Sequence, residues 1–156
     1  MKESNFQTDF GNWIKAHKEA AISIFGNNCV FELKIWKADK SKSFPLDAVK
    51  VHQIEGLLAA SGDGLFHKIS DSPIFKGMKS RFTAKKPCDC LFLSGANAFI
   101  VIWYYVKGER AIFRRCYAVS IGSWLKLALR CGQEKKKSFK IDRLKEYGVE
   151  FNIWDL

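Results

Sequence analysis

The chain has 156 residues, of which 47% are hydrophobic, and this composition excludes intrinsic disorder and suits one globular domain. Lys and Arg number 26 against 16 Asp and Glu, so the expected partners are polyanions, with nucleic acid ahead of an anionic membrane. No apolar run approaches the ~20 residues of a membrane span. The five Cys are an odd number and the first residues show no secretory signal, so we expect free thiols and a cytoplasmic location.

The predicted elements alternate between helices and strands. In chain order we expect a helix over 9–25, a strand over 29–37, a helix that begins near Pro45 and ends at 61–64, a short strand over 65–69, a strand pair over 88–93 and 98–106, a strand over 111–119, a helix over 122–131, a helical turn over 141–147 and a last strand over 149–154. This order predicts an α/β domain in which a mixed central β-sheet is flanked by helices.

Two charged residues interrupt the apolar strand predicted over 29–37. Glu32 and Lys34 are two residues apart, so in a strand both side chains point to one face. A carboxylate is a ligand that Mg²⁺ accepts, and an ammonium group beside it can orient a water molecule or hold a phosphate. The same pair also fits an exposed ion pair on an edge strand that has no further role.

Further polar residues lie at defined places in the predicted elements. Asp89 enters the strand predicted over 88–93, where the alternative is a turn residue that caps a loop. His52 and Gln53 lie on the second predicted helix, where the alternative is that both only face solvent.

Three motifs occur in a fixed order: Glu32-Leu-Lys34, Ser43-Phe-Pro-Leu46 and His52-Gln-Ile54. Together they resemble the PD-(D/E)xK nuclease superfamily, and within it the Holliday-junction-resolving branch of RecU-like and phage-type resolvases. The resemblance covers about residues 30–60. It implies a restriction-endonuclease-like fold and a single nuclease domain over residues 1–156. It also implies a Mg²⁺-dependent endonuclease, with Mn²⁺ as an alternative ion, that hydrolyses phosphodiester bonds of four-way DNA junctions.

The resemblance also implies roles for particular residues. Glu32 and Asp89 would bind the metal ion, with the carbonyl of Leu33 as an additional ligand, and Lys34 would position or deprotonate the attacking water. Glu19, on the first predicted helix, is the candidate for a third metal ligand, and its alternative is a solvated surface residue.

The order of these residues departs from the family pattern. The metal-binding Asp of the family precedes its E-x-K motif, whereas Asp89 follows Glu32 by 57 residues. The expected hairpin partner of the Asp89 strand carries the apolar run Val101-Ile-Trp103 in place of an E-x-K motif. We therefore expect the strands over 29–37 and 88–93 to lie side by side in the sheet.

Basic residues adjoin the predicted catalytic strands, as a channel that holds phosphates requires. The residues expected to bind nucleic acid are Lys37, Lys40, Lys42, His52, Gln53, Lys79, Arg81, Lys85 and Lys86. A third cluster follows at Lys135, Lys136, Lys137 and Lys140. Each cluster has the alternative of being a solvated surface.

Symmetric cleavage of a junction needs two active sites, so a resolvase of this size is expected to be a C2 homodimer. Two other functions remain open: another nuclease of the superfamily, of restriction or nicking type, and a basic DNA-binding module without catalysis. The Cys88-x-Cys90 pair lacks a second pair of ligands for zinc, so buried free thiols are the expectation there.

Overall fold

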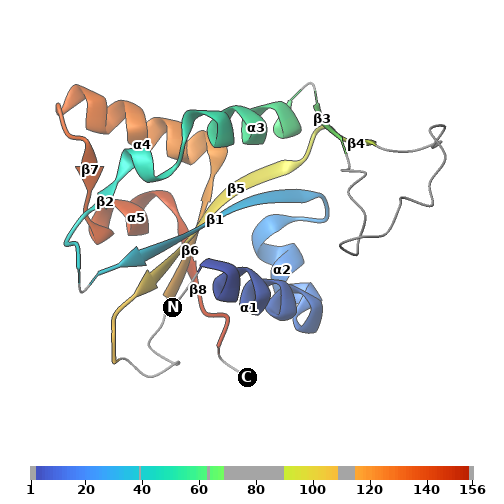
Figure 1. Cartoon of the computed structure of the whole chain (residues 1–156), viewed down its shortest axis with the longest axis horizontal. Helices are drawn as coiled ribbons and strands as arrows, with labels where there is room; N and C mark the ends of the chain where they lie inside the picture. Colours follow the sequence, from blue (N-terminus) through green and yellow to red (C-terminus); the bar gives the residue numbers. More distant parts are fainter. Residues whose placement is uncertain (1–2, 39, 63, 69–89, 109–114, 155–156) are drawn as a thin grey trace, which may run out of the picture.

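The structure is a computed structural model that describes residues 3–38, 40–62, 64–68, 90–108 and 115–154. Its centre is a four-stranded mixed sheet in the order β1-β5-β6-β8 (Figure 1). The parallel pair is β1 (Cys29–Lys37) with β5 (Asn97–Tyr105), and the antiparallel strands are β6 (Arg115–Ser120) and β8 (Val149–Phe151). Two small ladders lie outside it: β2 (Phe44–Pro45) with β7 (Ser138–Phe139), and β3 (Leu65–Lys68) with β4 (Cys90–Leu93).

Helices cover both faces of the sheet (Figure 1). One face carries α1 (Glu3–Ala16) and α2 (Lys18–Phe25), and the other carries α3 (Val51–Ser61), α4 (Ile121–Gln133) and α5 (Ile141–Tyr147). The α/β class and the mixed sheet flanked by helices are therefore confirmed. Among the helices that the structure describes, none has both the length and the apolar character needed to cross a bilayer.

The first predicted helix is divided into two at His17. The backbone of His17 leaves the helical region, with φ −122° and ψ 55°, and its ring stacks on Trp13 at a centroid distance of 5.7 Å. The break lets both segments face the sheet: Phe10 of α1 and Phe25 of α2 are buried and meet edge to face at 5.9 Å. Helical periodicity predicted the apolar residues of this segment but not the break between the two helices.

The Ser43-Phe-Pro-Leu46 segment packs into the core on the other face. Phe44 is 3% exposed, and its ring lies 5.8 Å from Trp36 and 5.5 Å from Phe139. A short 3₁₀ turn, η1 (Leu46–Ala48), follows, so α3 begins at Val51, later than the sequence predicts. Phe44 thereby anchors the connection between β1 and α3 to the core.

The predicted pairing of 88–93 with 98–106 is wrong. β4 pairs with β3, and β5 lies between β1 and β6. The short link before β5 explains the difference, because the Ala96 N–H donates to the Ala60 carbonyl at 2.9 Å and the Asn97 N–H donates to the Asn28 carbonyl at 2.8 Å. These bonds hold the link to the end of α3 and to the residue before β1, so β5 starts beside β1 and runs parallel to it.

The C-terminal elements follow the predictions more closely. The antiparallel pairing of β5 with β6 and the position of α5 are confirmed, while α4 extends beyond both ends of its predicted range. Among the described residues, the free thiols are those of Cys29, Cys116 and Cys131.

Candidate active site on strand β1

The charged residues of β1 lie on the face of the sheet that α3, α4 and α5 cover. Phe31 and Leu33 pack into the core beneath α1 and α2, whereas Trp36 packs into the core on the opposite face. Because side chains alternate along a strand, Glu32 and Lys34 share the face of Trp36. The prediction that these two side chains share one face is confirmed.

Glu32 and Lys34 form an ion pair at the border of the core. Lys34 Nζ lies 2.8 Å from Glu32 Oε1, and the two side chains are 15% and 23% exposed, respectively. Their partners in register on β5 are Ile100 and Ile102, both fully buried. Apolar neighbours and partial burial lower the local dielectric response, so this pair interacts more strongly than a fully solvated surface pair.

Gln53 of α3 holds the same carboxylate from above the sheet. Its Nε2 donates to Glu32 Oε1 at 2.7 Å, while its Oε1 accepts from the Lys50 backbone N–H at 2.8 Å. Lys50 is the N-cap of α3, so Gln53 connects the first turn of the helix to Glu32. Both contacts use Glu32 Oε1, and no described residue donates a hydrogen bond to Oε2. One carboxylate oxygen is thus held by two partners, and the other accepts no hydrogen bond from a described residue.

The start of α3 adds to the electrostatics of this region. The first backbone N–H groups of a helix carry a partial positive charge, equivalent to about half an elementary charge. Gln53 is in the first turn of α3, so this end of the helix lies close to Glu32. Together with the Lys34 ammonium group, it favours an anionic group such as a phosphate beside the carboxylate.

The described residues do not form a metal site by themselves. No group of three or more His, Cys, Asp or Glu side chains able to hold a metal ion is found within the parts of the chain that the structure describes. Mg²⁺, however, is commonly bound through one or two carboxylates, with waters and substrate phosphate oxygens completing its octahedron. Glu32, whose Oε2 accepts no hydrogen bond from a described residue, fits the role of one such carboxylate.

The expected neighbour of Glu32, Asp89, lies outside the described residues, as do Lys79, Arg81, Lys85 and Lys86. Strand β4 begins at the next residue, Cys90, and pairs with β3, whereas the described partner of β1 is β5. The expectation that the Asp89 strand lies beside β1 is therefore wrong, because the link between β4 and β5 is bonded to Ala60 and Asn28 and places β5 there. The assignment of Asp89 as a metal ligand depended on neighbouring strands, so it loses that support and remains only what the resemblance implies.

The structure does not bring Glu19 to Glu32. Glu19 is an exposed residue in the first turn of α2, and α2 covers the face of the sheet opposite to the ion pair. Its position matches the alternative of a solvated surface residue.

The predicted nucleic-acid contacts that the structure describes differ in their surroundings. Lys37, Lys40, Lys42 and His52 are exposed. Gln53 is half-buried and bonded to Glu32, a contact that sequence reasoning missed. The one available signal was its place in the first turn of the helix, where a Gln side chain can accept a bond from the N-cap N–H.

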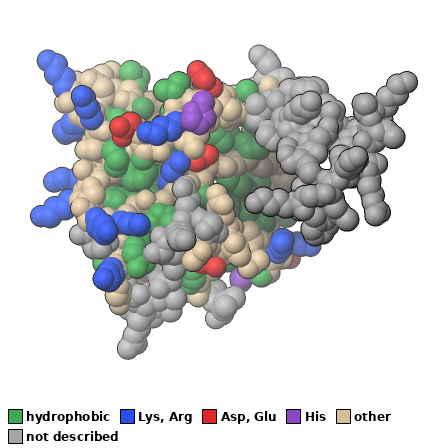
Figure 2. Space-filling view, in the orientation of Figure 1, with side chains coloured by type: hydrophobic (Ala, Val, Ile, Leu, Met, Phe, Trp, Pro, Cys, Tyr) green, Lys and Arg blue, Asp and Glu red, His purple; other side chains and the backbone are tan. Residues whose placement is uncertain are grey.

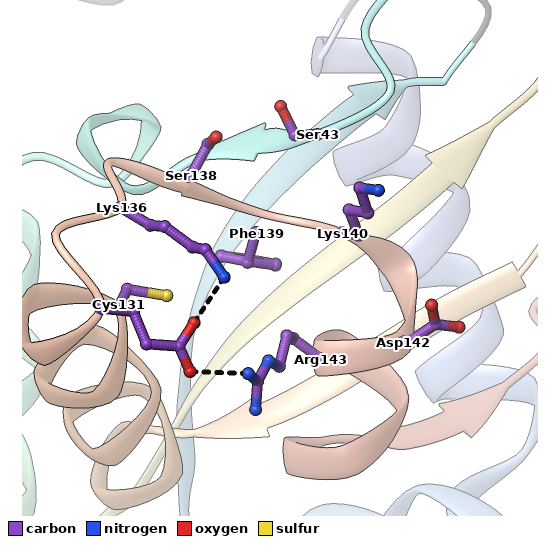
Figure 3. A pocket seen from close by; sticks show the side chains of 9 residues that line it. Ser43, Cys131, Lys136, Ser138, Phe139, Lys140, Asp142 and Arg143 are labelled. Carbon is purple, nitrogen blue, oxygen red and sulfur yellow. Dashed lines mark hydrogen bonds and ion pairs between the residues drawn. The ribbon is translucent and has the colours of Figure 1, made fainter.

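A second polar cluster lies beside the β2–β7 ladder and was not predicted. Glu134 accepts from Lys136 and from Arg143, at 2.7 Å each, at the edge of a pocket of about 410 Å³ (Figure 3). The hydrogen bond from Lys136 is the main cause that lowers the pKa of Glu134. Glu32 and Lys34 do not line this pocket.

Comparison with known proteins gives no match. No protein-family model, no curated protein and no solved structure is similar enough to the chain to count as related.

Proposed function

We propose that this protein is a metal-dependent DNA endonuclease with a restriction-endonuclease-like fold, and that it cleaves four-way junctions. The observation that carries the proposal is the Glu32–Lys34 pair on one face of β1, held from α3 by Gln53. The mixed sheet with helices on both faces supports it, since this is the architecture that the resemblance to PD-(D/E)xK nucleases implies.

The proposed reaction is hydrolysis of a phosphodiester. A water molecule loses a proton to solvent and its oxygen attacks phosphorus. The bond from phosphorus to the leaving oxygen breaks, and that oxygen takes a proton from solvent. Lys34 holds the attacking water or a phosphate oxygen and offsets negative charge as it develops. Gln53 fixes the orientation of the Glu32 carboxylate, so that Oε2 faces the reacting phosphate without reorganisation.

A divalent cation belongs to the same proposal. Mg²⁺ or Mn²⁺ held by Glu32, with Asp89 as the second carboxylate that the resemblance implies, would stabilise the charge of the phosphate and lower the pKa of a bound water. Among the described residues, Glu32 contributes a carboxylate oxygen that accepts no hydrogen bond from them, and Lys34 contributes a positive charge 2.8 Å from the other oxygen of the same group.

A substrate panel tests the function. Wild-type protein is incubated with a labelled four-way junction, a linear duplex and a single strand, in Mg²⁺, in Mn²⁺ and in EDTA. We expect cleavage of the junction in either metal and none in EDTA. Glu32→Gln should lower the cleavage rate about a thousandfold. Glu55→Gln should leave it unchanged, because Glu55 is an exposed residue of α3 outside the site.

The outcomes separate the competing functions. Equal cleavage of junction and linear duplex would favour a restriction or nicking type of nuclease. DNA binding without cleavage in either metal would contradict the proposal and favour a binding module. Cleavage that persists in Glu32→Gln would place the active site elsewhere.

A further inference from the structure

The β2–β7 ladder joins two lysine clusters that lie far apart in the sequence. Phe44 pairs with Phe139, and Pro45 pairs with Ser138. The Leu46 N–H also donates to the Lys137 carbonyl at 3.0 Å. The segment after β1 and the segment after α4 therefore lie side by side. We call their exposed lysines the β2–β7 lysine surface, defined as Lys40, Lys42, Lys135, Lys137 and Lys140.

These lysines are not neutralised by the described protein. No described acidic residue forms an ion pair with any of the five, although ion pairs are frequent just beside them. There, Glu134 is engaged by Lys136 and Arg143, whose side chains converge on its carboxylate (Figure 3). The carboxylate of Glu134, the C-cap of α4, is thus already paired, and none of the five lysines is paired with a described acid.

The charge of this surface has one dominant sign. Lys and Arg side chains gather along the side of the molecule where β2, β7 and the end of α4 lie, at the left of the view (Figure 2). Residues 37–47 and 134–142 carry seven lysines and four acids, so lysines predominate. The acids are Asp39, Asp47, Glu134 and Asp142. An extended polyanion fits such a surface better than a small anion, because the lysines come from separate segments.

The segment that carries Lys40 and Lys42 directly follows β1, the strand of the proposed active site. This strand runs from Glu32 and Lys34 to Lys37, where the segment leading to β2 begins. At roughly 3.3 Å per residue, Lys37 lies about 10 Å along the strand from Lys34. A duplex whose scissile phosphate lies at Lys34 has further phosphates within that reach, since each strand carries one per ~3.4 Å of helix axis.

We propose that the β2–β7 lysine surface binds the sugar–phosphate backbone of a DNA duplex arm beside the cleaved phosphate. The inference rests on the proposed function for the identity of the nucleic acid, but it makes a claim about binding that does not require cleavage. It assigns a role to the C-terminal lysines, which the resemblance to nucleases does not cover.

The test measures binding of a labelled junction and a labelled duplex by fluorescence anisotropy in EDTA, from 50 to 200 mM salt. The test variant is Lys137→Glu with Lys140→Glu. The control variant is Lys15→Glu with Lys18→Glu, which makes the same change in net charge at exposed positions of α1 and α2. Each phosphate contact contributes about −0.9 to the slope of log affinity against log salt concentration. If the test variant loses two contacts, its loss of affinity between 50 and 200 mM salt should be about twelvefold smaller than that of the wild type. The control variant should keep the wild-type slope.

Three results would overturn the inference. The first is an unchanged slope in the test variant, and the second is an equal change in both variants, which would mean that only net charge matters. The third is unchanged DNA binding together with lost binding to phosphatidylserine vesicles, which would make the surface a membrane contact. Thermal unfolding of both variants checks that they fold.

The proposed function can fail separately. If the wild type binds DNA through this surface but does not cleave in Mg²⁺ or Mn²⁺, the surface stands and the nuclease does not. If the test variant binds with the wild-type slope while the wild type cleaves, the nuclease stands and the surface does not.

Discussion

Gln53 connects α3 to the charged pair on β1, and replacing it by Met removes both of its hydrogen bonds while keeping a long side chain. The bond to the Glu32 carboxylate, 2.7 Å long and half-buried, belongs to the class worth about 1.5–3 kcal/mol. The bond from the Lys50 N–H is between neutral groups and adds about 0.5–1.5 kcal/mol. Partial exposure favours the lower values, so we expect Gln53→Met to lower the free energy of unfolding by about 2–3 kcal/mol, or the melting temperature by about 4–10 °C.

A double-mutant cycle isolates the contact between the two side chains. Urea unfolding of wild type, Gln53→Met, Glu32→Ala and the double variant should give a coupling energy of about 1–2 kcal/mol between positions 53 and 32. The control cycle pairs Gln53→Met with Glu55→Ala, because Glu55 is exposed and residues two apart on a helix do not face each other. A coupling below about 0.5 kcal/mol for Glu32, as expected for the control, would refute the proposed connection.

Three more predictions concern pH dependence, packing and assembly. Burial of Tyr117 and its hydrogen bond to Glu150 raise the pKa of the phenol to about 12, above the ordinary 10. The protonated phenol therefore contributes fully to stability below pH 10, and this contribution is lost as the pH rises from 10 to 12. Urea unfolding should show a decrease on the order of 2 kcal/mol across that range, and Tyr117→Phe should remove it. Phe44→Ala should lower the free energy of unfolding by about 3–5 kcal/mol, and a loss below 1 kcal/mol would contradict its role in the core. Light scattering at micromolar concentration should give a mass of twice 17.8 kDa, and a monomer that persists on junction DNA would contradict the resolvase.

The sequence predicted β1 and the side-by-side placement of its charges because both depend on local alternation. Cys29–Lys37 is the observed strand, and Glu32 and Lys34 do share a face. The period of a strand is two residues, so no long-range information was needed for this result.

Pairing between distant strands could not be predicted in the same way. The 90–93 segment is apolar and followed by a short link, which fits a hairpin with the next strand as well as the observed pairing with β3. The bonds that decide the matter, from Ala96 to Ala60 and from Asn97 to Asn28, join segments that are distant in sequence. The same holds for Gln53, whose contact with Glu32 spans 21 positions and depends on how α3 crosses the sheet.

The two faces of the sheet explain why Glu19 was a poor candidate. Its helix had to precede β1 in any arrangement, but the side of the sheet that the helix covers depends on the aromatic residues of α1 and α2. Phe10 and Phe25 pack beneath Phe31, on the face opposite to Glu32. Spacing along the chain contains no information about that choice.

The most direct test of the central claim is the single-turnover rate of four-way junction cleavage in Mg²⁺, with protein in excess over DNA. Glu32→Gln replaces one carboxylate oxygen by an amide NH₂ group and removes the negative charge. It should lower this rate about a thousandfold, which is in the range seen when a group that stabilises the transition state is removed. Binding of the junction in EDTA should stay within a few-fold of wild type, as should the cleavage rate of Glu55→Gln. A Glu32→Gln variant that cleaves at the wild-type rate, or a wild-type protein that does not cleave at all, would contradict the account.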